Sequence, residues 1–153
     1  MRFKPYTLTD KELSVIIDTF RNGYETHRPN KEVADILLLQ ANCGLKLDEI
    51  LNFNTDNIIL ENGVYRYCVN KKKYILTKQA MDIIKSLGTG RLFNMKSQAL
   101  WKHIRIVTEY LFLENISSES FRKYFAQKIY EKSGNKDTVR AFLQQDNLRY
   151  VLD

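Results

Sequence analysis

The segment SESFRKYFAQKIY, residues 118–130, places an arginine on a helix that is otherwise built to pack. Phe121 and Phe125 recur at helical spacing, so one face of this helix belongs in a core. Arg122 follows the first ring directly, and Glu119 stands three residues before it. Two interpretations stay open. Arg122 pairs with Glu119 on the helix surface, because i and i+3 side chains are neighbours, or it holds an anion supplied from outside.

Basic residues are concentrated in the C-terminal part of the chain. Residues 1–60 carry seven Lys/Arg and nine Asp/Glu, whereas residues 61–153 carry seventeen and nine. Between Asn62 and Thr108, ten basic residues accompany one acid, Asp82. Lysines also solvate ordinary surfaces, but this local excess indicates a polyanionic partner.

The composition is that of one globular domain over residues 1–153. The chain is 44% hydrophobic, has a formal net charge of +6, and contains no apolar run long enough to span a membrane. We therefore expect a cytoplasmic protein with no membrane partner. The two cysteines and two histidines lack ligand spacing, so we expect no metal, and we expect His103 to have no partner.

The periodicity predicts a mainly helical α+β fold, with helices around a small three-stranded antiparallel sheet. The alternating segment 57–76 predicts the strands, broken at Asn62-Gly63 and at residues 70–73. Trp101, Ile104 and Leu111 are expected in the core. Before the strands, the predicted helices are one opened by the Thr9–Glu12 capping box and ended near Gly23, one within residues 31–44, and a short one at Asp48–Phe53. After the strands, we predict one helix capped by Thr77 and ended at Gly88, one opened by Ser97, one from Ser118 to Lys132, and a last one capped by Asp137.

Four local patterns occur in an order that resembles the catalytic domain of the tyrosine recombinases, the phage-integrase family. They are TLTDKELSVIID, ANCGLKLDEILNFNTDNI, SESFRKYFAQKIYEKSGNKDTVRAFLQQ and NLRYVLD. The resemblance implies DNA binding, DNA recombination and integration, and an origin in a mobile genetic element. It implies cleavage through a 3′-phosphotyrosine, with no cofactor. Within residues 1–153 we expect no separate N-terminal DNA-clamping domain of the kind that most members carry, and other recombinase subunits are possible partners.

The resemblance assigns six positions to the catalytic site: Arg122, Tyr150, Lys72, Lys46, Gln145 and Glu119. Arg122 matches the second family arginine, Tyr150 the nucleophile, and Lys72, within the run 71–73, the hairpin lysine. The other three depart from the pattern, because Lys46 replaces an arginine, Glu119 a histidine, and Gln145 a histidine or tryptophan. Five residues separate Gln145 from Tyr150, where the family has about nine, which leaves open whether Tyr150 reaches Arg122.

The leading hypothesis is therefore a double-stranded-DNA-binding protein of this fold with impaired catalysis. The residues expected to contact DNA are Lys71, Lys73, Lys78, Lys96, Lys102 and Arg105. One alternative is an active strand transferase that uses Tyr150. The other is a protein-interaction module whose basic half meets an acidic partner.

Overall fold

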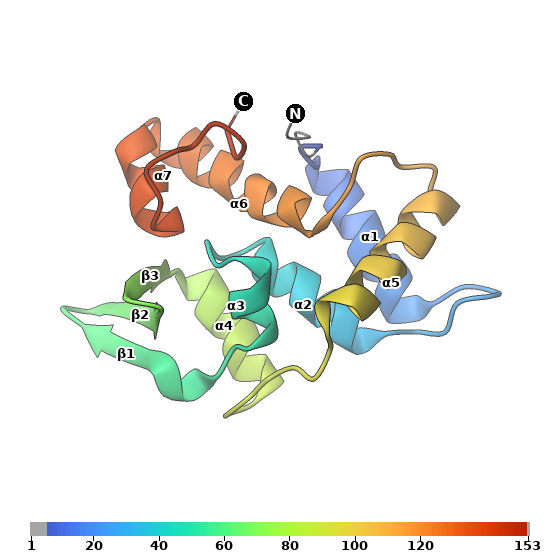
Figure 1. Cartoon of the computed structure of the whole chain (residues 1–153), viewed down its shortest axis with the longest axis horizontal. Coiled ribbons are helices and arrows are strands. Elements are labelled where there is room, and N and C mark those ends of the chain that lie inside the picture. The colour runs from blue at the N-terminus through green and yellow to red at the C-terminus, as the bar shows by residue number, and fades with distance from the viewer. Residues whose placement is uncertain (1–5, 153) are drawn as a thin grey trace.

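The computed structural model of the chain describes residues 6–152. Within that range lie seven α-helices, a short 3-10 helix and one sheet of three antiparallel strands. Figure 1 shows the sheet beside α4 at one end, α5 beside α1 at the other, and α6 and α7 along the side where the chain ends. The predicted fold class is confirmed.

The first two helices pack against each other and are capped as their sequences predict. Helix α1 (Asp10–Asn22) begins at Thr9, whose Oγ1 accepts from the Glu12 amide at 3.1 Å while Glu12 Oε1 accepts from the Thr9 amide at 2.9 Å. Helix α2 (Lys31–Gln40) is apolar nearly all round and lies at the centre of the molecule.

Helix α3 (Leu47–Leu51) is short, beginning and ending earlier than the predicted Asp48–Phe53. At its C-terminal end, the backbone N–H of Asn52 donates to the Asp48 carbonyl at 3.1 Å and the Asn52 side chain donates to the same carbonyl at 2.8 Å. The 3-10 helix Thr55–Asn57 then leads into the sheet.

The sheet has the order β1 (Ile58–Glu61), β2 (Val64–Val69), β3 (Lys72–Leu76). Two-residue turns join the strands, at Asn62-Gly63 and Asn70-Lys71, and all four residues have φ between +50° and +78°. That conformation matches the twist of antiparallel strands. The break expected over residues 70–73 is thus shorter, because Lys72 and Lys73 belong to β3.

Helices α4 (Lys78–Leu87) and α5 (Ser97–Tyr110) follow the sheet. Ile104 is buried in α5 as predicted, and Leu111 is half-buried. The prediction of a core position for Trp101 is wrong, since this side chain is 54% exposed. The Arg105 guanidinium covers its ring, 4.7 Å from the centroid, which gives the indole a cationic partner outside the core.

Helices α6 (Ser118–Ser133) and α7 (Lys136–Leu143) form a second apolar cluster with the C-terminal segment. Helix α7 is capped by Asn135, whose Oδ1 accepts from the Asp137 amide at 2.7 Å, and not by Asp137 as predicted. The buried members of the cluster are Phe125, Ala126, Val139, Leu143, Leu148, Val151 and Leu152. The chain after α7 is therefore folded back onto α6 and α7.

Over residues 6–152, no helix is long and apolar enough to cross a membrane. The same residues hold no group of three or more His, Cys, Asp or Glu side chains arranged to bind a metal ion.

Candidate functional site

A pocket of about 780 Å³ lies where the start of α3, the start of α6 and the C-terminal segment meet. Five of the six residues assigned to catalysis by resemblance line it: Lys46, Glu119, Arg122, Gln145 and Tyr150. These residues come from segments separated by up to about a hundred positions, and the fold brings them to one concave surface.

Lys46 is positioned by the first turn of α3. It is the residue before the helix, and its backbone N–H donates to Glu49 Oε1 at 2.9 Å, while its side chain is exposed at the pocket. Glu49 is buried, and the same oxygen accepts from the Tyr74 hydroxyl at 2.6 Å. Strand β3 is thereby tied to the start of α3.

Lys72, the sixth assigned residue, approaches the same group of cations from β3. Partial burial, together with the charges of Lys46 and Arg122, lowers the pKa of its ammonium. The ammonium also lies 5.9 Å from the Tyr74 ring centroid. Among the three hairpin lysines, Lys72 is therefore the one that faces Lys46, while Lys71 is exposed at the turn and Lys73 pairs with Glu61 at 3.2 Å.

Arg122 is 2% exposed, and its guanidinium is held by three oxygens. Nε donates to the Gly44 carbonyl at 2.9 Å, Nη1 to Gln145 Oε1 at 2.8 Å, and Nη2 to the Leu143 carbonyl at 3.1 Å. A guanidinium carries five N–H donors, so donors remain for a further acceptor.

The alternative in which Arg122 pairs with Glu119 is wrong. Among the described residues, no ion pair joins the two side chains, and the three oxygens hold Arg122 instead. Glu119 lines the pocket and places a carboxylate at its edge.

Tyr150 is carried by a turn that follows α7. The turn is closed by hydrogen bonds from the Val151 and Leu152 amides to the Leu148 carbonyl, at 3.1 and 3.0 Å. The Arg149 guanidinium lies 5.9 Å from the centroid of the Tyr150 ring. The short spacing after Gln145 therefore still brings Tyr150 to the pocket that Arg122 lines.

A second hollow, of about 760 Å³, shares Lys46 and Glu119 with the pocket and continues to the start of α5. Arg91, Lys96, Ser97 and Gln98 line its far side.

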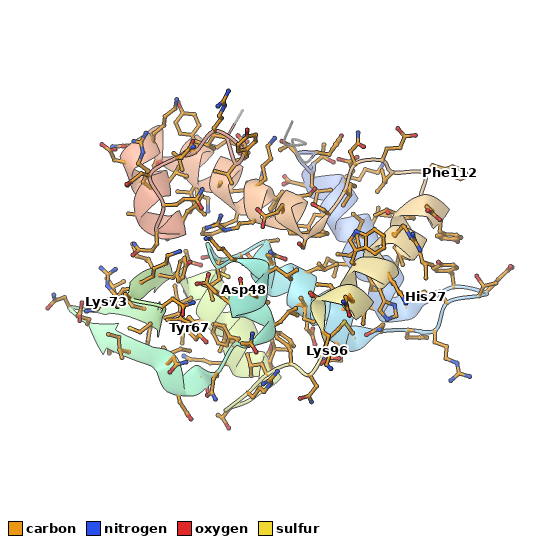
Figure 2. The ribbon with its side chains drawn as sticks, viewed as in Figure 1. His27, Asp48, Tyr67, Lys73, Lys96 and Phe112 are labelled. Carbon is orange, nitrogen blue, oxygen red and sulfur yellow. The ribbon has the colours of Figure 1, made fainter. Side chains whose placement is uncertain are left out.

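The six residues expected to contact DNA are all exposed and lie on the hairpin, α4 and α5. Figure 2 shows Lys73 at the hairpin and Lys96 at the start of α5, with Asp48 of α3 between them in that view. Arg105 covers Trp101, and Lys73 is paired with Glu61, so their charges are partly engaged within the protein.

Several residues of the site carried no signal in the sequence. Asn115, Ser117 and Asn147 line the pocket from loops, and the Gly44 and Leu143 carbonyls hold Arg122 through backbone atoms. Only Glu49 was foreseeable, because a glutamate three residues after a helix-starting position is typical of a capping contact.

No family model matches this sequence, and no curated protein matches it. Solved structures do resemble the fold. The catalytic domain of bacteriophage HP1 integrase is 14% identical, with 97% of this chain and 85% of that chain covered and a TM-score of 0.69. The XerA recombinase is 13% identical, with 95% of this chain and 58% of that chain covered and a TM-score of 0.69. The XerH site-specific recombinase, solved bound to its difH substrate, is 18% identical, with 97% of this chain and 49% of that chain covered and a TM-score of 0.66.

These likenesses show that the chain has the fold of tyrosine recombinase catalytic domains. The chain spans about half the length of the XerH recombinase.

Proposed function

We propose that this protein binds double-stranded DNA, with a backbone phosphate in the pocket between α3, α6 and the C-terminal segment. The observation that carries the proposal is the approach of Lys46, Lys72 and Arg122 to one another from three different elements. Burial and then the charge of Lys46 lower the pKa of Lys72, and the nearby carboxylate of Glu49 offsets only part of that shift, so repulsion among the cations remains. A phosphate among the three would offset that repulsion.

The fold and the surface charge support the same proposal. XerH and the Tn1549 integrase have been solved with DNA, and both share this fold. The exposed lysines of the hairpin and the basic residues of α5 extend the positive charge beyond the pocket. Contacts from such exposed cations go mainly to the DNA phosphates and do not distinguish one base sequence from another.

We further propose that strand cleavage by this site is impaired. Lys46 lacks the planar fork with which an arginine grips two phosphate oxygens. Glu119 adds negative charge at the rim, which disfavours a phosphate where the family has a histidine. The amide oxygen of Gln145 already accepts a hydrogen bond from Arg122, and its Nε2 donates to the Asn147 carbonyl at 2.8 Å.

The test is duplex binding as a function of salt, for the wild type and for the variant with Lys71→Ala, Lys72→Ala and Lys73→Ala. Each lost phosphate contact should flatten the slope of log K against log salt by about 0.9. The control variant changes Lys11, Lys132 and Lys136 to alanine, which removes the same charge from exposed sites elsewhere. An equal slope in the wild type and the hairpin variant would refute the proposal that the hairpin contacts DNA phosphates. Competition by polyglutamate as strong as competition by DNA would favour an acidic protein partner.

A second candidate function, DNA strand transfer, is favoured by one observation, that Tyr150 and Arg122 line the same pocket. Cleavage would leave the Tyr150 oxygen bonded to a 3′-phosphate and release a 5′-hydroxyl. A nicked duplex traps that adduct, because the short released strand diffuses away. A covalent band on a denaturing gel that Tyr150→Phe abolishes would establish the enzyme. Impaired catalysis predicts no such band.

A further inference from the structure

Gln145 stands between Arg122 and the turn that carries Tyr150, and both ends of its amide are engaged within the protein. Its Oε1 accepts from Arg122 Nη1 at 2.8 Å, and its Nε2 donates to the Asn147 carbonyl at 2.8 Å. The tyrosine-recombinase resemblance assigns this position to a side chain that donates directly to the phosphate. The observed contacts leave little capacity for that role, since the amide oxygen accepts from Arg122 and one of the two N–H donors is used by the Asn147 carbonyl.

We propose that Gln145 is a positioning residue, which clasps the C-terminal turn to Arg122 and does not itself bind phosphate. The clasp consists of Arg122, Gln145 and the Asn147 carbonyl. This proposal names what sets the position of Tyr150 relative to Arg122. Its relation to phosphate rests on the proposed function.

The connections on either side of Gln145 support this role. Before it, the Leu143 carbonyl also accepts from Arg122, at 3.1 Å, so two points of the chain end are fixed to one guanidinium. After it, Leu148 and Val151 are buried against α6 and α7. Asn147 and Tyr150 lie between these anchors and line the pocket. The amide of Gln145 is thus one of the polar links of the intervening segment and the one that ties it to Arg122, while Arg140 Nε of α7 donates to the Asp146 carbonyl at 2.9 Å.

Amide hydrogen exchange measured by NMR on the free protein tests the clasp without DNA. In Gln145→Ala, the amides of Val151 and Leu152, which donate to the Leu148 carbonyl, should exchange about tenfold faster, because the turn opens locally more often. The control is Gln144→Asn, at a residue whose amide contacts the Ala141 carbonyl and the Lys73 N–H instead. It should leave the exchange of Val151 and Leu152 unchanged.

A conservative variant separates positioning from general loss of packing. In Gln145→Glu the charged carboxylate still accepts from Arg122 but cannot donate to the Asn147 carbonyl, so exchange at pH 7 should stay faster than in the wild type. A protonated carboxyl can accept from Arg122 and donate to the Asn147 carbonyl, so protection factors should rise as the pH falls through the pKa of the new carboxyl, which the charge of Arg122 lowers from its ordinary value of about 4. The wild type should show no such step.

Duplex binding supplies the remaining readout. If Gln145 acts only on position, Gln145→Ala leaves the salt slope of duplex binding unchanged. If it binds phosphate, the duplex affinity of Gln145→Ala falls at every salt concentration while the slope and the exchange in the turn stay the same, since a neutral amide releases no counterion, and the proposal is overturned. Unchanged exchange with an unchanged affinity overturns it too. Failure of the wild type to bind duplex would refute the proposed function, and the exchange comparison would then decide the clasp alone.

Discussion

Arg122 shows how a buried cation is retained in this protein. Its guanidinium donates to two backbone carbonyls and one amide oxygen, and among the described residues no carboxylate forms an ion pair with it, although the charge of the buried Glu49 acts on Tyr74 together with that of Arg122. Burying a charge without a directly paired partner is costly, so such a residue is retained where its charge is used. This reasoning supports a ligand-binding role, and it also makes Arg122 a structural link between Gly44 and Leu143.

Replacing Arg122 by methionine should destabilise the protein by about 2–4 kcal/mol, because buried oxygens lose their donor. Urea unfolding measures the change. The control is Lys102→Met, which removes an exposed charge and should shift the free energy of unfolding by less than about 0.5 kcal/mol. Similar stability for the two variants would mean that the three hydrogen bonds of Arg122 contribute little.

His27 and His103 form a second polar contact, contrary to the expectation that His103 has no partner. His27 Nε2 and His103 Nδ1 lie 3.3 Å apart, and the two rings meet edge to face. One nitrogen must donate and the other accept, so the contact needs at least one neutral ring. Burial, and then the charge of His27, lowers the pKa of His103.

Stability should therefore fall as the pH drops. A histidine whose pKa is lower in the folded state binds more protons in the unfolded state. Its contribution is complete above about pH 6.5, the unfolded value, and is lost as the pH falls through the folded value. Thermal melts between pH 8 and pH 5 should show a decline in Tm that His103→Gln reduces. Parallel pH profiles for the two proteins would exclude this contact as the cause.

The β2–β3 hairpin combines a proposed function with a conformational cost. Its turn places Lys71 at φ +63°, a left-handed conformation that side chains with a Cβ disfavour. The neighbouring β1–β2 turn has glycine at the equivalent position, Gly63, at φ +78°. A lysine at this turn is consistent with selection for charge at the hairpin tip over local stability.

Lys71→Gly should therefore stabilise the fold by about 0.5–1 kcal/mol and weaken duplex binding at the same time. Lys71→Ala removes the same charge and keeps the Cβ, so it should weaken binding equally without stabilising. Urea unfolding and duplex titration on the three proteins give both quantities. Stabilisation by both substitutions, or by neither, would contradict the argument from backbone strain.

Elements with strong local signals were predicted well, while contacts between distant segments were not. The capping box at Thr9, the two-residue turn at Asn62-Gly63 and the Thr77 cap are encoded within a few residues, and each occurs as expected. Trp101 has helical spacing suited to a core, yet the stacking of Arg105 allows it to remain exposed.

The candidate site illustrates the same limit. Family resemblance indicated which residues converge, and five of the six line one pocket. The partners of Arg122 were not foreseeable, because two are backbone carbonyls and Gly44 lies 78 positions away in the sequence. Likewise the resemblance suggested a donor at Gln145, but its contacts depend on where the chain turns after α7.

The loop between α2 and α3 lies directly against the end of α7, at Gly44. A methyl group on Gly44 would lie 2.1 Å from the Phe142 carbonyl oxygen, so only glycine permits this approach. The Gly44 carbonyl is also the acceptor for Arg122 Nε, at 2.9 Å. Lys46, two residues later, and Gln145, after α7, both line the pocket. Close contact at Gly44 therefore sets the spacing between the two sides of the site.

Gly44→Ala should push α7 away from this loop and destabilise the protein by about 2–3 kcal/mol through overpacking. It should also accelerate amide exchange at the end of α7 and in the turn after it, because Leu143 and Gln145 lose their alignment with Arg122. Gly134→Ala is the control, since its Cβ meets open space and it bears only the cost of a left-handed backbone, at φ +63°, about 1 kcal/mol. Exchange that is faster everywhere by the same factor would indicate a general loss of stability, whereas an effect confined to α3, α7 and the C-terminal turn would show that Gly44 sets the geometry of the pocket.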